Sequence, residues 1–184
     1  NFTLRNLEIV HPSHHEGKSL LDIIDRTATP MGGRMMRRRL ILPLKSVNEI
    51  NRRLSLIEFF NKEENLKYDV LENLKSISDL DRLLGKLAAE KITPKELGYL
   101  RDSLASIHQI KNLLGTHHDV LAWIEPLDSH TTELIAYLQN HLNEELPVNI
   151  SKGDVIKQGI SQELDRLRNL QASGKSFLEE MCQR

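Results

Sequence analysis

Apolar residues recur every three or four positions along most of the chain, which is the spacing of a helix with one buried face. Between residues 46 and 60, for example, Val47, Ile50, Leu54 and Ile57 fall on one side of a helical wheel. The same spacing predicts a long last helix over residues 161–184. Further helices are predicted at 19–24, 29–42, 46–60, 63–75, 79–90, 93–114, 119–124 and 129–142. The fold class is therefore mainly α, an irregular multi-helix bundle with a long C-terminal helix.

Two short segments alternate apolar and polar residues instead, which is the pattern of a half-buried strand. The first runs from about residue 2 to residue 10 and predicts a short N-terminal strand. The second runs from about 147 to 158 and predicts a small β-hairpin: Val148 and Ile150 alternate with polar residues, a turn follows at 151–154, and Val155 and Ile156 come after it. We expect residues 1–160 to form one helical core domain and residues 161–184 to begin a helix that leads out of it.

The helix from residue 29 has the most firmly specified start. Thr29 is a favourable N-cap and Pro30 suits the first helical position. Gly32 and Gly33 follow in the first turn, where each glycine costs about 1 kcal/mol relative to alanine. Such a cost needs a reason, and we expect that another stretch of backbone approaches the helix closely here.

The same helix carries four arginines. Arg34, Arg37 and Arg38 share one face, and guanidinium groups bind phosphates through paired hydrogen bonds. This face either makes a weak contact with phosphate groups or is simply exposed to solvent. No aromatic residues lie between the arginines to stack on bases, which counts against binding of nucleic acid. Arg39 falls between two apolar patches. It must pair with a carboxylate, lie over an aromatic ring or extend outward into solvent.

Overall charge gives no field that would attract nucleic acid or an anionic membrane, because 25 Lys and Arg residues face 26 Asp and Glu residues. The single Cys182 excludes an internal disulfide and favours a reducing compartment. No apolar run is long enough to span a bilayer. We expect a cytoplasmic protein that makes no membrane contact.

No motif in the sequence predicts an enzyme. The G-x-x-x-x-G-K-[ST] phosphate loop and the G-x-S-x-G nucleophile turn are both missing. His11, His14 and His15 share one loop, but no thiol or further carboxylate has a recognised metal-ligand spacing. We therefore expect no catalytic, cofactor-binding or metal-binding residues in this chain.

A long string resembles the core, or lever, domain of the MutS family of mismatch-repair ATPases. Its signature residues here are Asp25, Arg26, Thr27, Thr29, Pro30, Met31, Gly32, Gly33, Arg34 and Pro43. Three further strings agree in order, so the resemblance covers essentially the whole chain. They are Thr3-Leu4-Arg5-Asn6-Leu7-Glu8, Asp79-Leu80-Asp81-Arg82-Leu83-Leu84 and Glu163-Leu164-Asp165-Arg166-Leu167-Arg168. The chain departs from the family at Met35 and Met36, where leucine is more common, and at Arg39, where tryptophan is common.

The resemblance implies a non-catalytic structural domain that links mismatch-binding and clamp modules to an ATPase during mismatch repair. ATP and Mg would bind in an ATPase domain that lies outside this sequence. The lever helix that begins at residue 161 would lead toward the clamp. The implied partners are the other domains of the same chain and mismatched duplex DNA, with a homodimeric parent protein acting beside a MutL-type partner.

The alternative is a free-standing helical interaction scaffold. It would use the apolar stripe that runs from Leu164 to Met181 to dock a partner helix. The last helix lacks a stop signal and the first residue is not methionine, so we expect both ends to continue in a longer protein. The scaffold alternative instead predicts that the natural termini of the protein lie close to residues 1 and 184 of this sequence.

Overall fold

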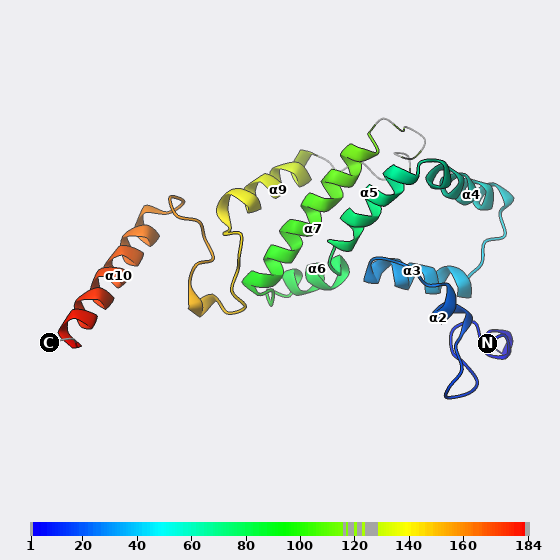
Figure 1. Cartoon of the computed structure of the whole chain (residues 1–184), viewed down its shortest axis with the longest axis horizontal. Coiled ribbons are helices and arrows are strands. Elements are labelled where there is room, and N and C mark those ends of the chain that lie inside the picture. The colour runs from blue at the N-terminus through cyan, green and yellow to red at the C-terminus, as the bar shows by residue number, and fades with distance from the viewer. Residues whose placement is uncertain (1, 116, 118–119, 121–122, 124–128, 183–184) are drawn as a thin grey trace.

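The computed structural model describes residues 2–115, 117, 120, 123 and 129–182. Its described part is mainly α, as predicted, and extended in shape, with the two termini at opposite ends (Figure 1). The helices are α1 (Phe2–Asn6), α2 (Leu20–Ile24), α3 (Pro30–Ile41), α4 (Val47–Lys62), α5 (Glu64–Lys75), α6 (Leu80–Ala88), α7 (Pro94–Leu113), α9 (Ser129–His141) and α10 (Gln162–Cys182), with a 3₁₀ turn η1 (Ile150–Lys152).

Hydroxyl side chains set the starts of several helices. Thr29 and Thr93 each accept a hydrogen bond from the backbone N–H three residues later, at 3.0 and 3.3 Å. Ser19 does the same before α2, and the Asp22 carboxylate reciprocates by accepting from the Ser19 N–H at 2.9 Å. These caps satisfy N–H groups that have no partner within the helix, which explains why the predicted starts are confirmed.

The core lies where α7 packs against α5, α6 and α9, which Figure 1 shows in the middle of the molecule. Helix α4 packs on α5, and α2 packs on α3. Met31, in the first turn of α3, contacts the central cluster and so joins the N-terminal end to the core. The buried members of that cluster are Val70, Ile77, Ile110, Leu114 and Val120.

The predicted N-terminal strand at about 2–10 is wrong, because α1 occupies its first half. The Leu7 N–H bonds back to the carbonyl of Thr3 at 3.0 Å, the i to i−4 pattern of a helix. Phe2 and Leu7 are both exposed, so the alternation does not mark a buried face. Further along the segment, the carbonyls of Glu8 and Ile9 accept from the N–H groups of Leu20 and Leu21, both at 3.0 Å, so these backbone groups pair with the first turn of α2 and not with a strand.

The predicted hairpin at about 147–158 is also wrong. The turn forms, as η1, and Gly153 takes a positive φ of 76° there. The flanking residues do not pair with each other: Ile156 instead forms a single antiparallel bridge with Leu142, at the end of α9. Val148 and Ile150 are exposed, so their alternation carried no information about burial.

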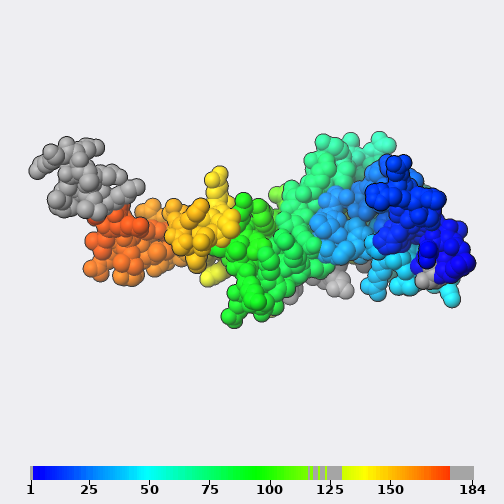
Figure 2. Space-filling view, turned by 90° about the horizontal axis from the view of Figure 1, so that it is seen from below, coloured from blue at the N-terminus to red at the C-terminus, as the bar shows by residue number. Residues whose placement is uncertain are grey.

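The predicted helix at 119–124 lies outside the described residues, apart from Val120 and Trp123. The long last helix is confirmed over Gln162–Cys182. Searching the described residues finds no helix that is both long and apolar enough to cross a membrane. Figure 2 shows the first part of α10, in orange, far from the blue N-terminal segment.

A buried arginine fastens α7 to the segment that follows α9. Arg101 is only 8% exposed, and its guanidinium donates to the carbonyls of Asn143 at 2.6 Å and Glu144 at 3.1 Å. Its Nε donates to the Asp102 carboxylate at 2.8 Å. The three bonds balance a charge that would otherwise be costly to bury.

We expect Arg101→Gln to lower the free energy of unfolding by about 2 kcal/mol, because hydrogen bonds from charged donors contribute about 1.5–3 kcal/mol and the carbonyls lose their partner. Denaturant unfolding followed by circular dichroism measures this change. The control is Arg166→Gln on α10, whose exposed side chain pairs, among the described residues, with Glu163 alone, at 4.0 Å. Equal stability of the two variants would contradict a structural role for Arg101.

Candidate functional site

The loop before α3 folds around its own side chains. Asp25 accepts from both the backbone N–H and the hydroxyl of Thr27, at 2.9 and 2.7 Å. These two bonds, the backbone one first, hold the pKa of the Asp25 carboxyl below its ordinary value. Arg26 turns back and donates to the carbonyl of Asp25 at 3.2 Å. The signature residues before Thr29 therefore form a small polar turn that feeds the helix.

The two glycines face this turn. A Cβ added at Gly32 would lie 3.0 Å from the Thr29 hydroxyl oxygen and 3.2 Å from the Thr27 Cβ. At Gly33 it would meet Asp25 and Thr27 oxygens at 3.4 Å, nearly an ordinary contact. The expectation that another backbone approaches is wrong, since the neighbours are threonine and aspartate side chains of the preceding loop. Gly32 is the position with the tighter constraint.

Arg34 ties α3 to the start of α6. Its guanidinium donates to both carboxylate oxygens of Asp79, at 2.7 and 2.8 Å, and to Asp81 at 2.6 Å. Asp79 is also the N-cap of α6, where it accepts from the Arg82 N–H at 3.4 Å. The planar guanidinium matches a carboxylate edge, so this pair fixes orientation as well as distance. A phosphate at Arg34 would have to replace these carboxylates, and its phosphate contact stays a prediction.

Hydrogen bonding by Arg34 is the main cause that lowers the pKa of Asp79, to about 2. The bond from the Arg82 N–H acts in the same direction. The two carboxylates in turn raise the pKa of Arg34. The pair is thus fully ionised at neutral pH, although half of the Arg34 side chain remains open to solvent.

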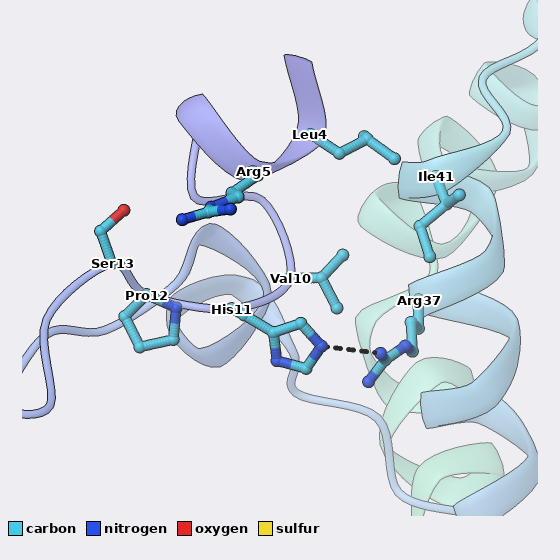
Figure 3. Close-up of a pocket in the computed structure, with 8 residues that line it drawn as sticks. All are labelled: Leu4, Arg5, Val10, His11, Pro12, Ser13, Arg37 and Ile41. Atoms are coloured by element: carbon cyan, nitrogen blue, oxygen red, sulfur yellow. Dashed lines mark hydrogen bonds between the residues drawn. The ribbon is translucent and has the colours of Figure 1, made fainter. Parts of the chain in front are cut away.

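Arg37 borders a groove of about 480 Å³ between α3 and the N-terminal segment, shown in Figure 3. Its Nη2 lies 3.2 Å from Nε2 of His11, and because arginine only donates, that ring nitrogen accepts. The floor is apolar, and Arg5 supplies a second guanidinium at the rim. The lining residues are Leu4, Arg5, Val10, His11, Pro12, Ser13, Arg37 and Ile41.

Arg38 and Arg39 border a different groove, of about 360 Å³, between the end of α3 and α4. Of the three arrangements expected for Arg39, the structure shows the third, in which the side chain extends outward into solvent. It lies beside Arg53 of α4. Partial burial and the charge of Arg53 lower the pKa of Arg39. The helix itself ends at Ile41, with Pro43 following the C-cap residue Leu42 as predicted.

A second polar junction lies at the base of α10. Asp165 accepts from the Gly159 N–H at 2.8 Å, and Arg168 donates to the carbonyl of Ile156 at 2.7 Å. The two side chains also pair with each other at 3.3 Å. Both belong to the string after Glu163 that carried part of the resemblance, and they fasten the helix to the segment that bridges to α9.

Sequence reasoning missed the partners in these junctions. Asp79 and Asp81 were part of a recognised string, but nothing in their spacing links them to Arg34, 45 and 47 residues away. Arg101 was not singled out, and its position on a helix with many apolar residues was the one available signal. Among the described residues no group of three or more His, Cys, Asp and Glu is placed to hold a metal ion.

Comparison with known sequences identifies relatives over nearly the full chain. The family profile described as MutS domain III matches residues 2–184. Proteins named DNA mismatch repair protein MutS from Flavobacterium johnsoniae and Christiangramia forsetii are each 40% identical, over 97% and 100% of this chain. The protein of that name from Flavobacterium psychrophilum is 42% identical over 97% of it. The chain spans about a fifth of the length of these relatives, 21% in each case.

We expect Gly32→Ala to be less stable than Gly33→Ala by about 1 kcal/mol. Both gain helix propensity, but the Cβ at residue 32 displaces the Thr29 hydroxyl from its cap, which is worth about 1 kcal/mol. Chemical denaturation of the two variants side by side measures the difference. If Gly32→Ala matches or exceeds Gly33→Ala in stability, close approach is not the reason for this glycine.

The Arg34–Asp79 pair predicts acid-dependent stability. Because the folded-state pKa of Asp79 is lowered to about 2, its contribution is present above its ordinary pKa near 4 and is lost as pH falls from about 4 to about 2. Arg34→Gln should therefore be less stable than the parent chain at neutral pH, with the difference shrinking toward pH 2. Unfolding free energies measured across this range test the prediction.

Asp79→Asn is the matched control for that titration. Asparagine caps a helix about as well as aspartate, so this variant removes the ion pair and keeps the cap. Its stability difference from Arg34→Gln should change less over the same pH range than the difference between the parent chain and Arg34→Gln, because only the cap contribution of Asp79 still titrates there. A difference between the parent chain and Arg34→Gln that persists undiminished at pH 2 would contradict the role assigned to the pair.

Proposed function

This chain belongs to the MutS domain III family, and we propose that it is the core and lever segment of a mismatch-recognition ATPase. In this role it links mismatch-binding and clamp modules to the ATPase during mismatch repair, and it performs no catalysis itself. Residues 1–160 act as the core and residues 161–184 begin the lever toward the clamp. The ATPase domain of the longer protein binds ATP and Mg.

The observation that carries this proposal is the way α10 is held. Its base is fixed by Asp165 and Arg168, while the apolar residues Leu167 and Leu170 further along it are 53% and 58% exposed. A helix that is fastened at its base and exposes Leu167 and Leu170 beyond it is suited to carry a displacement to or from a neighbouring module. This supports a mechanical role.

The proposed partners follow from the family. They are the other domains of the same polypeptide and mismatched duplex DNA, with a homodimer acting beside a MutL-type protein in the cytoplasm. Direct DNA contact by this segment is at most weak. Arg37 and Arg38 are better placed for it than Arg34, whose guanidinium is already bound by two carboxylates.

The scaffold alternative rests on the same exposed leucines, because a partner helix would also cover them. The two functions differ in what they require of the base of α10. A docking surface needs only the exposed stripe, whereas a lever also needs a stiff attachment. The experiment below separates them.

We expect the double change Asp165→Asn and Arg168→Gln, made in the longer protein, to uncouple ATP from DNA. ATP hydrolysis and nucleotide-free binding of a mismatched duplex should persist, because both sites lie elsewhere. The ATP-driven change in DNA affinity should shrink by about fivefold or more, the lower end of typical coupling between sites. Fluorescence anisotropy of a labelled mismatched duplex, with and without ATP, measures this change.

Arg166→Gln is the control, because this neighbouring arginine is exposed and its one ion pair within the described residues is a distant one with Glu163, at 4.0 Å. It should leave the ATP response intact. Unchanged coupling in the double variant would contradict the lever role and favour the scaffold. Circular dichroism of the variants verifies that α10 is still helical.

A further inference from the structure

The groove between the end of α3 and α4 combines an apolar floor with three guanidinium groups. Met35 and Leu42 are 53% and 62% exposed there, although both are large apolar side chains. The full lining is Met35, Arg38, Arg39, Leu42, Leu44 and Arg53. At about 360 Å³, the volume is near the lower end of that of small ligand sites and admits one or two side chains.

The three arginines of this groove differ from Arg34 and Arg37 in lacking a hydrogen-bond or ion-pair partner within the described residues. Arg34 is held by two carboxylates, and Arg37 donates to a histidine nitrogen. In contrast, Arg38, Arg39 and Arg53 make no hydrogen bond or ion pair with any residue in the described part of the chain. Like charges held together repel, and the neighbouring Arg53 makes the charged form of Arg39 less favourable.

We propose that this groove binds an acidic peptide segment of a partner protein, in which carboxylates flank an apolar side chain. The apolar side chain covers Met35 and Leu42, and the carboxylates pair with the guanidinium groups above them. Charge complementarity is the basis of the choice, since an incoming carboxylate removes the repulsion between Arg39 and Arg53. This inference does not depend on the lever role proposed above.

Duplex DNA fits the same surface less well. A phosphate backbone would satisfy the arginines but offers no apolar group to cover Met35 and Leu42, which would stay exposed. The chain also carries a formal net charge of −1, so it provides no wider field for a polyanion. An acidic peptide satisfies both the polar and the apolar part of the groove.

The test uses the chain of residues 1–184 and a short fluorescein-labelled peptide in which aspartates flank a central pair of leucines. Fluorescence anisotropy should report binding that weakens with added salt. Arg39→Gln and Arg53→Gln should each weaken it about tenfold, the effect of losing one charge-assisted hydrogen bond. Arg37→Gln, on the other groove of the same helix, is the matched control and should bind as the parent chain does.

Two altered peptides divide the site into its parts. Replacing the aspartates by asparagine tests the arginines, and replacing the leucines by serine tests the apolar floor; each should weaken binding. Leu42→Ser in the protein should reproduce the second effect. Because Arg39→Gln relieves repulsion, it should not lower the thermal stability of the chain, so loss of binding cannot be ascribed to unfolding.

Three outcomes would overturn the proposal. Equal binding of the aspartate and asparagine peptides would show that the charges play no part. A homoduplex DNA that competes with the peptide and is itself weakened by Arg39→Gln would identify a phosphate site instead. A concentration-dependent dimer in sedimentation, lost in Arg39→Gln, would show that a second copy of the chain occupies the groove.

Discussion

The contact between Arg34 and the paired aspartates at the start of α6 is the constraint on which the N-terminal third of the molecule depends. Helix α3 has no fully buried side chain, and its partly buried Met31 packs against the core. A bidentate pair adds a fixed direction to that contact, because a planar guanidinium meets a carboxylate in few orientations. Since Asp79 also caps α6, one side chain holds both helices in register.

The same helix shows how neighbouring arginines acquire different roles. Positions 34, 37, 38 and 39 span little more than one turn, so their side chains radiate in different directions. Arg34 pairs with aspartates and Arg37 donates to a histidine, whereas Arg38 and Arg39 line a groove with Arg53 and make no hydrogen bond or ion pair within the described residues. The number of arginines on the helix gives only its positive charge. The contacts that each arginine makes determine whether it stabilises the fold or is available to a partner.

Features that depend on local contacts could be predicted from the sequence. The starts of α2, α3, α4 and α7 follow from a hydroxyl and the N–H three residues later, which any reader of the sequence can locate. The alternating stretches failed because strand pairing needs a second segment, and a run as short as Phe2–Asn6 suits a helical turn equally well. The backbone contact expected at Gly32 was wrong, because the close neighbours are the side chains of the preceding threonines, which no helical spacing indicates.

Long-range pairs were beyond such reasoning, since helical periodicity orders residues within one helix and is silent about which helices meet. Arg34 with Asp79, and Arg101 with Asn143, join residues more than 40 apart in the chain. The remaining polar contacts between elements are just as remote from any local pattern. Ser103 of α7, which is fully buried, accepts from the N–H of Ser78, the residue before Asp79.

These polar contacts follow one another along the length of the molecule. From the base of α10 they run through the segment bridged to α9, then to α7, then to the start of α6 and finally to α3. The residues in order are Arg168, Ile156, Leu142, Asn143, Arg101, Ser103, Ser78, Asp79 and Arg34. Contiguity does not by itself transmit a change, which requires an element with two arrangements. It does mean that an element displaced at either end is joined to the other by directional bonds rather than by adaptable apolar packing alone.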